Sequence, residues 1–341
     1  MNTLFPLSLL AAIGLPLALH AADEKPPLAS PDEPLVEKFS FVKAAESLDR
    51  TSLAWTRRHK CGACHTNYPF MMSRSAFKEL PTPAFAEVRK WFEDRVANWD
   101  AEVKTNKSYK RESVGHAVAL AVDDARGTGK LHPLTRTALD RMWTLQRKDG
   151  AWDWPKCKWP PFEIDDYYGA LMAAVGLGHA PENYAAGDSA KAGMEKLRAY
   201  FKATPPPSEH HRAWLLWAAT RLDGVMSDEE KRAAISALLA LQRGDGGWSM
   251  EALGKGWVGR EGEKANPDAP SDGYGTGLVV FVLREAGVAA SNPAIQRGAN
   301  WLRANQRESG RWFVRSLNGV EQHYISDTAT AFAVLALKAC E

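Results

Sequence analysis

The sequence predicts an all-α protein built as an α/α toroid of about five helix pairs, with a short additional segment before it. Two observations lead to this fold class. A short string, Gln-x-x-x-Gly-x-Trp, occurs three times at the ends of helical segments. Between its copies, amphipathic helices alternate with helices that are almost wholly apolar. Such an alternation predicts an outer ring of helices facing water and an inner ring buried on most sides.

Length and composition are those of a folded protein with a substantial core. The chain has 341 residues, of which 45% are hydrophobic and 25% charged, both ordinary proportions. Its 43 Lys and Arg are balanced by 41 Asp and Glu, and the formal net charge is +2. This balance gives no basic surface for nucleic acid, so nucleic acid is not expected as a partner.

The first 22 residues form an apolar run without Asp, Glu, Lys or Arg. This run is short for a bilayer span, and Pro6 and Pro16 interrupt it, so residues 1–22 are predicted to be an export signal. The alternative is an uncleaved membrane anchor, and a peripheral contact with the membrane is a separate expectation. In both cases the body lies outside the cytoplasm, in the periplasm or secreted. Residues 23–36 are Pro-rich and charged and are predicted to be a linker.

The next segment, residues 37–83, contains the string Cys61-x-x-Cys64-His65. Two thiols at this spacing can add to the two vinyl groups of a haem, and the adjacent histidine can bind the iron. A thioredoxin-like pair would need a strand before the motif and a helix after it, within an alternating pattern that this sequence lacks. A zinc site would need further ligands, and there is no second Cys-x-x-Cys. The motif therefore predicts a covalent haem c, with Cys61 and Cys64 forming the thioethers and His65 as the proximal ligand.

The sequence does not identify the second axial ligand of such a haem. Met71 and Met72 follow the motif closely, and a thioether would raise the reduction potential. The short spacing makes it difficult for either to reach the opposite haem face. His116, on the apolar helix VGHAVALAV, is the next candidate, although a single histidine on such a face is more often a core residue. A five-coordinate iron is the remaining alternative.

Residues 84–341 form the repeat array. Its glycines permit the left-handed turn that follows a helix, the tryptophans can fold back onto that helix, and the glutamines can reach backbone groups at the start of the next one. A fourth copy, AGMEKLRAYFKATPP, lacks the Gln and Trp. The three full copies are Gln146/Gly150/Trp152, Gln242/Gly246/Trp248 and Gln306/Gly310/Trp312.

An apolar helix rich in small residues follows each copy and begins with acidic or polar residues. The predicted starts of these inner helices are Asp165, His210, Ser271 and Ser326. An earlier pair, PAFAEVRKWFEDRVANWDAEV and ESVGHAVALAVDDA, fits the same alternation. The N-termini of the inner helices should therefore gather around one mouth of the central cavity.

The Gln-x-x-x-Gly-x-Trp repeats resemble the QW motifs of the squalene-hopene cyclase and prenyltransferase superfamily, over about residues 84–341. Together with the haem motif, the chain is similar to exported squalene-cyclase-like proteins that carry a c-type haem site. The resemblance implies the toroid fold and an apolar central cavity.

Class II terpene cyclases protonate an alkene with the middle carboxyl of an Asp-x-Asp-Asp motif. On the resemblance, the matching residues are Glu163, Asp165 and Asp166, with Asp165 as proton donor and Glu163 in place of the first aspartate. The alternative is that Asp165 and Asp166 cap a helix, like Ser271/Asp272 and Ser326/Asp327 at equivalent places. The cap is favoured, because the other inner helices show the same residue types and because cyclases of this family use two helical domains.

The two remaining cysteines, Cys157 and Cys340, are predicted to form a disulfide or to be two buried thiols. A zinc-dependent prenyltransferase site is not favoured, because these cysteines lie at a repeat turn and at the C-terminus. Residues suited to a polar ligand are expected at the mouth. They are Asp165, Asp166, Tyr167, Tyr168, His210, His211, Asp272, Tyr274, His323 and Tyr324.

These observations predict an exported single-haem c-type protein on a terpene-cyclase-like toroid, exchanging electrons with a small molecule or a redox-protein partner. Such a protein could be a haem-dependent oxidoreductase. The alternatives are a terpenoid cyclase using Asp165 as general acid, which is less favoured, and a non-catalytic binding module.

Overall fold

The structure is a computed structural model that describes residues 28–77, 82–319 and 324–341. These residues form 14 α-helices, one 3₁₀-helix and three isolated β-bridges, and the described chain contains no longer strand. The predicted all-α fold class is confirmed. The predicted export signal, residues 1–22, lies outside the described residues.

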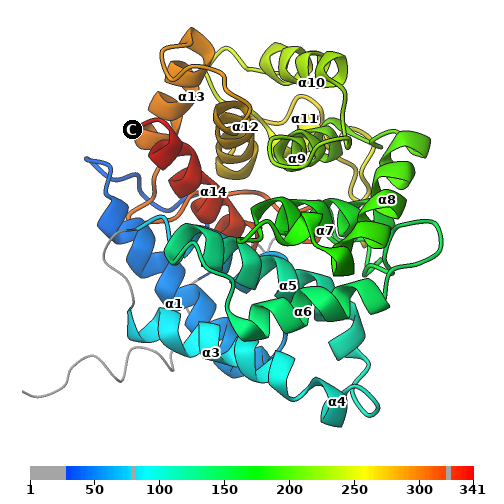
Figure 1. Cartoon of the computed structure of the whole chain (residues 1–341). Helices are drawn as coiled ribbons and strands as arrows, with labels where there is room; N and C mark the ends of the chain where they lie inside the picture. The colour runs from blue at the N-terminus through cyan, green and yellow to red at the C-terminus, as the bar shows by residue number, and fades with distance from the viewer. Residues whose placement is uncertain (1–27, 78–81, 320–323) are drawn as a thin grey trace, which may run out of the picture.

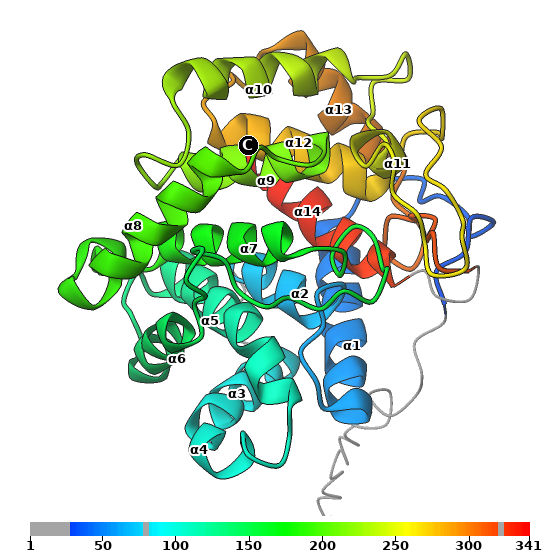
Figure 2. The same cartoon turned by 90° about the vertical axis from the view of Figure 1, so that its right-hand side faces the viewer.

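Outer and inner helices alternate along the chain and form two rings, which Figures 1 and 2 show from two sides. The outer helices are α1 (Phe41–His59), α3 (Pro83–Ala97), α6 (Pro133–Thr144), α8 (Asp188–Ala203), α10 (Asp228–Ala240) and α13 (Pro293–Ala304). The inner helices are α2 (Asn67–Arg74), α5 (Ser108–Gly127), α7 (Asp166–His179), α9 (Glu209–Ala219), α12 (Gly273–Glu285) and α14 (Ile325–Ala339). Helices α4 (Trp99–Glu102) and α11 (Met250–Leu253) and the 3₁₀-helix Tyr184–Ala186 lie in connections.

The ring has six helix pairs in the described chain, rather than about five. Each inner helix packs against the next, and α2 packs between α14 and α5, which closes the inner ring. Helix α1 contacts both α3 and α14. The segment 37–83, which the sequence set apart from the toroid, thus supplies the sixth pair. Its outer helix is amphipathic and its inner helix is buried throughout, as in the other pairs.

The repeated string forms the same turn each time. Gly150, Gly246 and Gly310 have φ angles of 98°, 92° and 87°, in the left-handed region that favours glycine. The buried tryptophans donate from Nε1 to a carbonyl of the preceding outer helix: Trp152 to Met142, Trp248 to Leu238 and Trp312 to Leu302, at 2.7–2.8 Å.

The glutamines connect each turn to the next outer helix. Gln146 Nε2 donates to the Gly193 carbonyl on α8 at 3.0 Å, and Gln242 Nε2 donates to the Ala294 carbonyl on α13 at 2.8 Å. Gln306 follows the same rule across the ring closure: its Nε2 donates to the Ser40 carbonyl at 2.9 Å, and its Oε1 accepts from Ser40 N at 2.8 Å. Ser40 is the N-cap of α1, so the last repeat turn holds the first helix.

Part of the predicted linker also belongs to this closure. Val36 N donates to the Gln306 carbonyl at 2.9 Å, and Glu308 N donates to the Pro34 carbonyl at 2.9 Å. Residues 33–36 are therefore held against the last repeat turn, because its exposed backbone groups offer hydrogen bonds that a Pro-rich segment can use without forming a core.

Aromatic side chains from the inner helices fill much of the ring interior. Trp217 and Phe281 have ring centroids 5.0 Å apart, and Phe332 lies 5.7 Å from Trp214 and 5.6 Å from Tyr274. All five side chains are buried. Small residues elsewhere on the inner helices allow this close approach, since a Cβ at Gly277 would lie 2.7 Å from Ala333 N.

Candidate functional site

The cysteine motif lies at the mouth of the toroid. It occupies the turn between α1 and α2, directly before the N-terminus of an inner helix. The imidazole of His65 stacks on Tyr324, the N-cap residue of α14, at a centroid distance of 5.1 Å. It also contacts Trp159, in the loop before α7, at 5.8 Å. The fold thus places the motif and the N-termini of the other inner helices on one face (Figure 2).

Hydrogen bonds fix the tautomer of His65. Thr66 Oγ1 donates its single proton to Asp327 Oδ2 at 3.0 Å, and burial raises the pKa of this carboxyl to about 6. Thr66 Oγ1 must then accept from His65 Nδ1, 2.8 Å away. Burial lowers the pKa of His65 to about 3, so the ring is neutral and Nε2 carries a lone pair.

Aromatic rings surround this imidazole. Trp55 contacts it edge-on at 4.6 Å, in addition to Tyr324 and Trp159. Arg260 covers the outer side of Trp159 at 5.0 Å, and its Nε donates to the Cys157 carbonyl at 3.3 Å. His65 is only 7% exposed as a result, so water has little access to it.

Burial is the main influence on the pKa of both motif thiols. Burial, reinforced by the nearby Glu112 carboxylate, raises the pKa of Cys61. Burial and Glu163 raise the pKa of Cys64 well above its usual value. A thioredoxin-like cysteine needs a lowered pKa and a helix beginning at the motif, whereas α2 begins only at Asn67.

The candidates for a second axial ligand lie on two inner helices, α2 and α5. Met71 and Met72 are buried in the core on α2. His116, on α5, contacts Tyr68, Trp91 and Phe92, and none of these rings contacts His65.

The orientation of the His116 side chain is explained by a contact within its own helix. Its Nδ1 pairs with the Glu112 carbonyl at 2.7 Å, while its buried Nε2 has no hydrogen-bond partner. A cavity of about 20 Å³ lies beside it, enough for one water molecule. Burial lowers the pKa of His116 to about 3.

Asp165 is the N-cap of α7, as the favoured sequence interpretation predicted. Its Oδ1 accepts from Tyr168 N at 2.8 Å, and its Oδ2 lies 3.2 Å from His211 Nε2. Burial alone would raise the pKa of Asp165, but the interactions with His211 and the Tyr168 N–H bring it below its usual value. The group is therefore an ionised carboxylate at neutral pH.

The other two members of the acidic motif have separate partners. Asp166 pairs with Arg147 Nη1 at 2.6 Å and Lys156 Nζ at 2.8 Å, which hold its pKa below the usual value against the effect of burial. Glu163 interacts with the Cys157 thiol, and burial together with this carboxyl raises the pKa of Cys157 to about 11.

A second polar cluster lies at the start of α9 and α12. Trp214 Nε1 donates to the Tyr274 hydroxyl at 3.3 Å, and His210 Nε2 lies 2.7 Å from the same hydroxyl. The other ring nitrogen of His210, Nδ1, is buried without a hydrogen-bond partner. Trp257 and Tyr168 cover its ring.

Several sequence predictions at the mouth need correction. Cys157 is exposed and Cys340 half-buried, and both are free thiols, so they are neither a disulfide nor two buried thiols. Ser326 and Asp327 lie within the first turn of α14, whose N-cap is Tyr324, and Asp327 accepts a hydrogen bond from Thr66. Asp272 caps α12 as predicted. His323 lies outside the described residues.

Sequence reasoning missed the residues that support the motif. Asn67 Oδ1 accepts from Ala63 N at 2.7 Å and its Nδ2 donates to the Cys61 carbonyl at 3.2 Å, so one side chain holds the motif turn. The sequence feature that could have pointed to Asn67 is its position two residues after His65. Thr66 and Asp327 are 261 residues apart, and no local pattern could have paired them.

Two further observations concern the described residues alone. They contain no cluster of three or more His, Cys, Asp or Glu side chains suited to hold a metal ion. None of the helices that the structure describes is long and apolar enough to cross a membrane.

The chain is similar to two curated proteins over a limited region. One is a squalene–hopene cyclase from Bradyrhizobium diazoefficiens, 33% identical over 125 residues. The other is a probable squalene–hopene cyclase from Sinorhizobium fredii, 32% identical over 120 residues. Each match covers 35% of this chain and 16% of the relative, so the chain matches only a small part of these proteins. No protein-family model matches the sequence. The similarity supports a helical fold like that of terpene cyclases.

Proposed function

We propose that the protein carries a covalent haem c at the toroid mouth, on Cys61 and Cys64 with His65 as axial ligand, and acts in electron transfer or in redox conversion of a small ligand. The observation that carries the proposal is the state of His65. Burial lowers the pKa of its imidazole to about 3, its Nδ1 lies 2.8 Å from Thr66 Oγ1, and its Nε2 would bind the iron. Two thiols at the attachment spacing complete a donor set that fits this group.

The chain's own residues would then have distinct tasks. When bound, the haem supplies one-electron chemistry. Thr66 and Asp327 keep the His65 ring in one tautomer and orientation. Trp55, Trp159 and Tyr324 exclude water from it, which would tune the reduction potential.

Covalent attachment can be tested directly. Protein made together with a haem-attachment system should keep its haem through denaturation and acid-acetone extraction, and Cys64→Ser should weaken that retention. Cys157→Ser is the matched control, because Cys157 is exposed and outside the motif; it should retain haem like the unmodified protein. Complete loss of haem on extraction, or stoichiometric zinc in its place, would overturn the proposal.

The second axial ligand needs a separate experiment. If Met71 or Met72 binds iron, the oxidised protein shows a thioether-to-iron absorption band near the red end of the spectrum, and replacement by leucine removes it. Leucine conserves volume at these buried positions and so preserves the core. Absence of the band in the unmodified protein would leave His116 or a five-coordinate iron, which His116→Leu then distinguishes.

A terpenoid cyclase using Asp165 is the second candidate, because of the similarity to squalene–hopene cyclases and the contact between Asp165 and His211. It is less favoured, since a general acid must hold a proton and the pKa of Asp165 is lowered. We expect no cyclised product when the protein is incubated with squalene and the products are read by mass spectrometry. Cyclised product that disappears in Asp165→Asn, which keeps the helix cap, would establish the cyclase instead.

A further inference from the structure

A separate cavity of about 410 Å³ opens beside the N-terminus of α12, a size within the range of small-molecule sites. It lies between α11, the loop before α12, the end of α13 and the repeat turn that follows it. None of the residues assigned to the haem site or to the Asp165 motif lines it. We refer to this cavity as the rim pocket.

Aromatic rings form the apolar part of the rim pocket. Trp301 and Phe313 are half-buried and Trp312 is fully buried. The polar edges of both indoles are already engaged: Trp301 Nε1 donates to Asp245 at 3.0 Å and Trp312 Nε1 to the Leu302 carbonyl at 2.8 Å. Trp301 and Phe313 therefore offer apolar surface, whereas Trp312 has no exposed surface of its own, and no indole N–H is left for a ligand.

Polar groups with unused hydrogen-bonding capacity complete the lining. The Glu251 side chain is 4% exposed; its Oε2 accepts from Asn266 N at 2.7 Å, and its Oε1 has only a long contact of 3.4 Å with Arg315 Nη1. A carboxylate has about four acceptor positions, so Glu251 can accept more. Arg307 donates from Nη1 to the Glu33 carbonyl, and its guanidinium carries further N–H groups that can donate. The pocket thus combines an acceptor and a donor that both lack full partners.

The charges in the lining compensate one another. Glu251 pairs with Arg315, and both oxygens of Asp272 accept backbone N–H groups, from Gly275 at 2.7 Å and Met250 at 2.5 Å. Two acidic and two basic residues belong to the lining. An anion would meet Glu251 and a cation would meet Arg307, so a neutral ligand with both donors and acceptors fits best.

We propose that the rim pocket binds a neutral pyranose sugar, as a free saccharide or as one unit of a glycan. A pyranose ring presents a flat face of C–H groups, which matches the aromatic surface. Its hydroxyl groups both donate and accept, which matches Glu251 and Arg307. This proposal is independent of the haem.

Isothermal titration calorimetry on the whole protein tests the proposal. The probes are methyl β-glucoside, methyl β-galactoside and cellobiose, each at millimolar concentration. Sorbitol is the control for hydroxyl groups without a ring face, and glucose 6-phosphate is the control for an anion. At least one pyranoside should bind, and both controls should bind more weakly.

Three variants locate the site. Trp301→Leu should weaken binding of the pyranoside at least tenfold, and Glu251→Gln should also weaken it, because the amide keeps one acceptor for Asn266 N but loses the other. Trp143→Leu is the matched control: Trp143 is a half-buried tryptophan on α6, outside the pocket, with its Nε1 likewise engaged. It should bind like the unmodified protein.

Several results would contradict the proposal that the rim pocket binds a pyranose. Failure of all three pyranosides to bind, equal binding of sorbitol, or tighter binding of glucose 6-phosphate would overturn the proposal. So would unchanged binding in Trp301→Leu when circular dichroism shows that the variant is folded.

Discussion

The glycines of the repeat turns show how single residues determine this fold. At Gly310 the φ angle is 87°, and a Cβ would lie 2.1 Å from the Lys43 carbonyl oxygen. At Gly150 the corresponding distance, to the Lys196 carbonyl oxygen, is 2.3 Å. Both the backbone conformation and the close approach of the next outer helix therefore require glycine.

We predict that Gly310→Ala lowers the free energy of unfolding by about 2–5 kcal/mol, since left-handed strain and a backbone clash add together. Gly129→Ala is the matched control, because Gly129 has a φ of 67° but no neighbour within 4 Å of a Cβ. It should cost only about 1–2 kcal/mol. Denaturant unfolding measures both values, and equal losses would show that the close approach has no energetic consequence.

The pKa of Asp165 is a second property set by single residues. Replacing His211 with Leu should raise this pKa, because the hydrogen bond and the electrostatic interaction that favour the carboxylate are lost while burial remains. Carboxyl chemical shifts followed by NMR as a function of pH give the value. Asp166 is the internal control, since Lys156 and Arg147 lower its pKa. A parallel rise at Asp166 would mean that α7 itself had moved.

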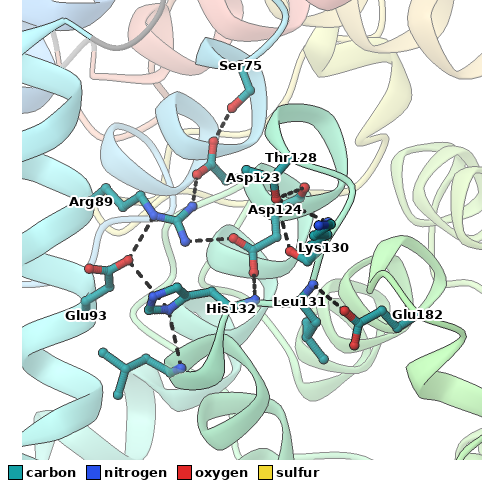
Figure 3. A network of polar contacts seen from close by, with 11 residues as sticks. Ser75, Arg89, Glu93, Asp123, Asp124, Thr128, Lys130, Leu131, His132 and Glu182 are labelled. Carbon is teal, nitrogen blue, oxygen red and sulfur yellow. Dashed lines mark hydrogen bonds and ion pairs between the residues drawn. The ribbon is translucent and has the colours of Figure 1, made fainter.

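One arginine forms ion pairs with three carboxylates at the contact between α3 and α5 (Figure 3). Arg89 contacts Asp123, Asp124 at 2.7 Å and Glu93 at 2.9 Å. Asp123 also accepts from Ser75, so the network connects two helix pairs of the ring. Burial raises the pKa of Asp123 to about 6, and Arg89 offsets this only in part.

This raised pKa makes stability depend on pH in a defined direction. Folded Asp123 holds its proton more tightly than the unfolded chain, so its contribution to the free energy of unfolding falls as pH rises from about 4 to about 6, by at most about 3 kcal/mol. The free energy of unfolding of Asp123→Asn, minus that of the unmodified protein, should therefore increase over the same pH interval. Unfolding experiments at pH 4, 5, 6 and 7 measure it, and a constant difference between the two proteins would contradict the prediction.

In the whole molecule, the ring closes where the segment before α1 meets the last repeat turn. The Gln306 side chain makes two hydrogen bonds to Ser40, while Val36 and Pro34 pair with the backbone of the same turn. Helix α1 therefore has the same kind of support as α8 and α13, which the first two repeat turns hold.

We predict that Gln306→Ala weakens protection from amide hydrogen exchange in α1 and in residues 33–40, at a cost of about 1–3 kcal/mol. Gln242→Ala is the matched control and should weaken protection in α13 instead. Exchange monitored by mass spectrometry separates the two regions. An α1 that already exchanges rapidly in the unmodified protein would show that it is not an integral part of the ring.

Much of the fold could be predicted because its signals are local. The alternation of amphipathic and apolar helices and the three repeat turns each occupy a few consecutive residues. The sixth helix pair was missed because α2 has only eight residues and directly follows the cysteine motif. That motif was interpreted as a haem-attachment segment separate from the toroid. The capping role of Asp165 was predicted correctly, as its position before an apolar helix allowed.

The sequence alone determined the all-α class, the repeat turns, the inner and outer helices and the cysteine motif, since each depends on residues close together in the chain. Only the tertiary structure decided that the motif segment closes the ring, that Asp327 orients His65 through Thr66, and that Cys157 and Cys340 do not pair. The physical reason is ring closure. It brings residues near the two ends of the chain into contact, and such contacts follow from the packing of all six helix pairs rather than from any local pattern.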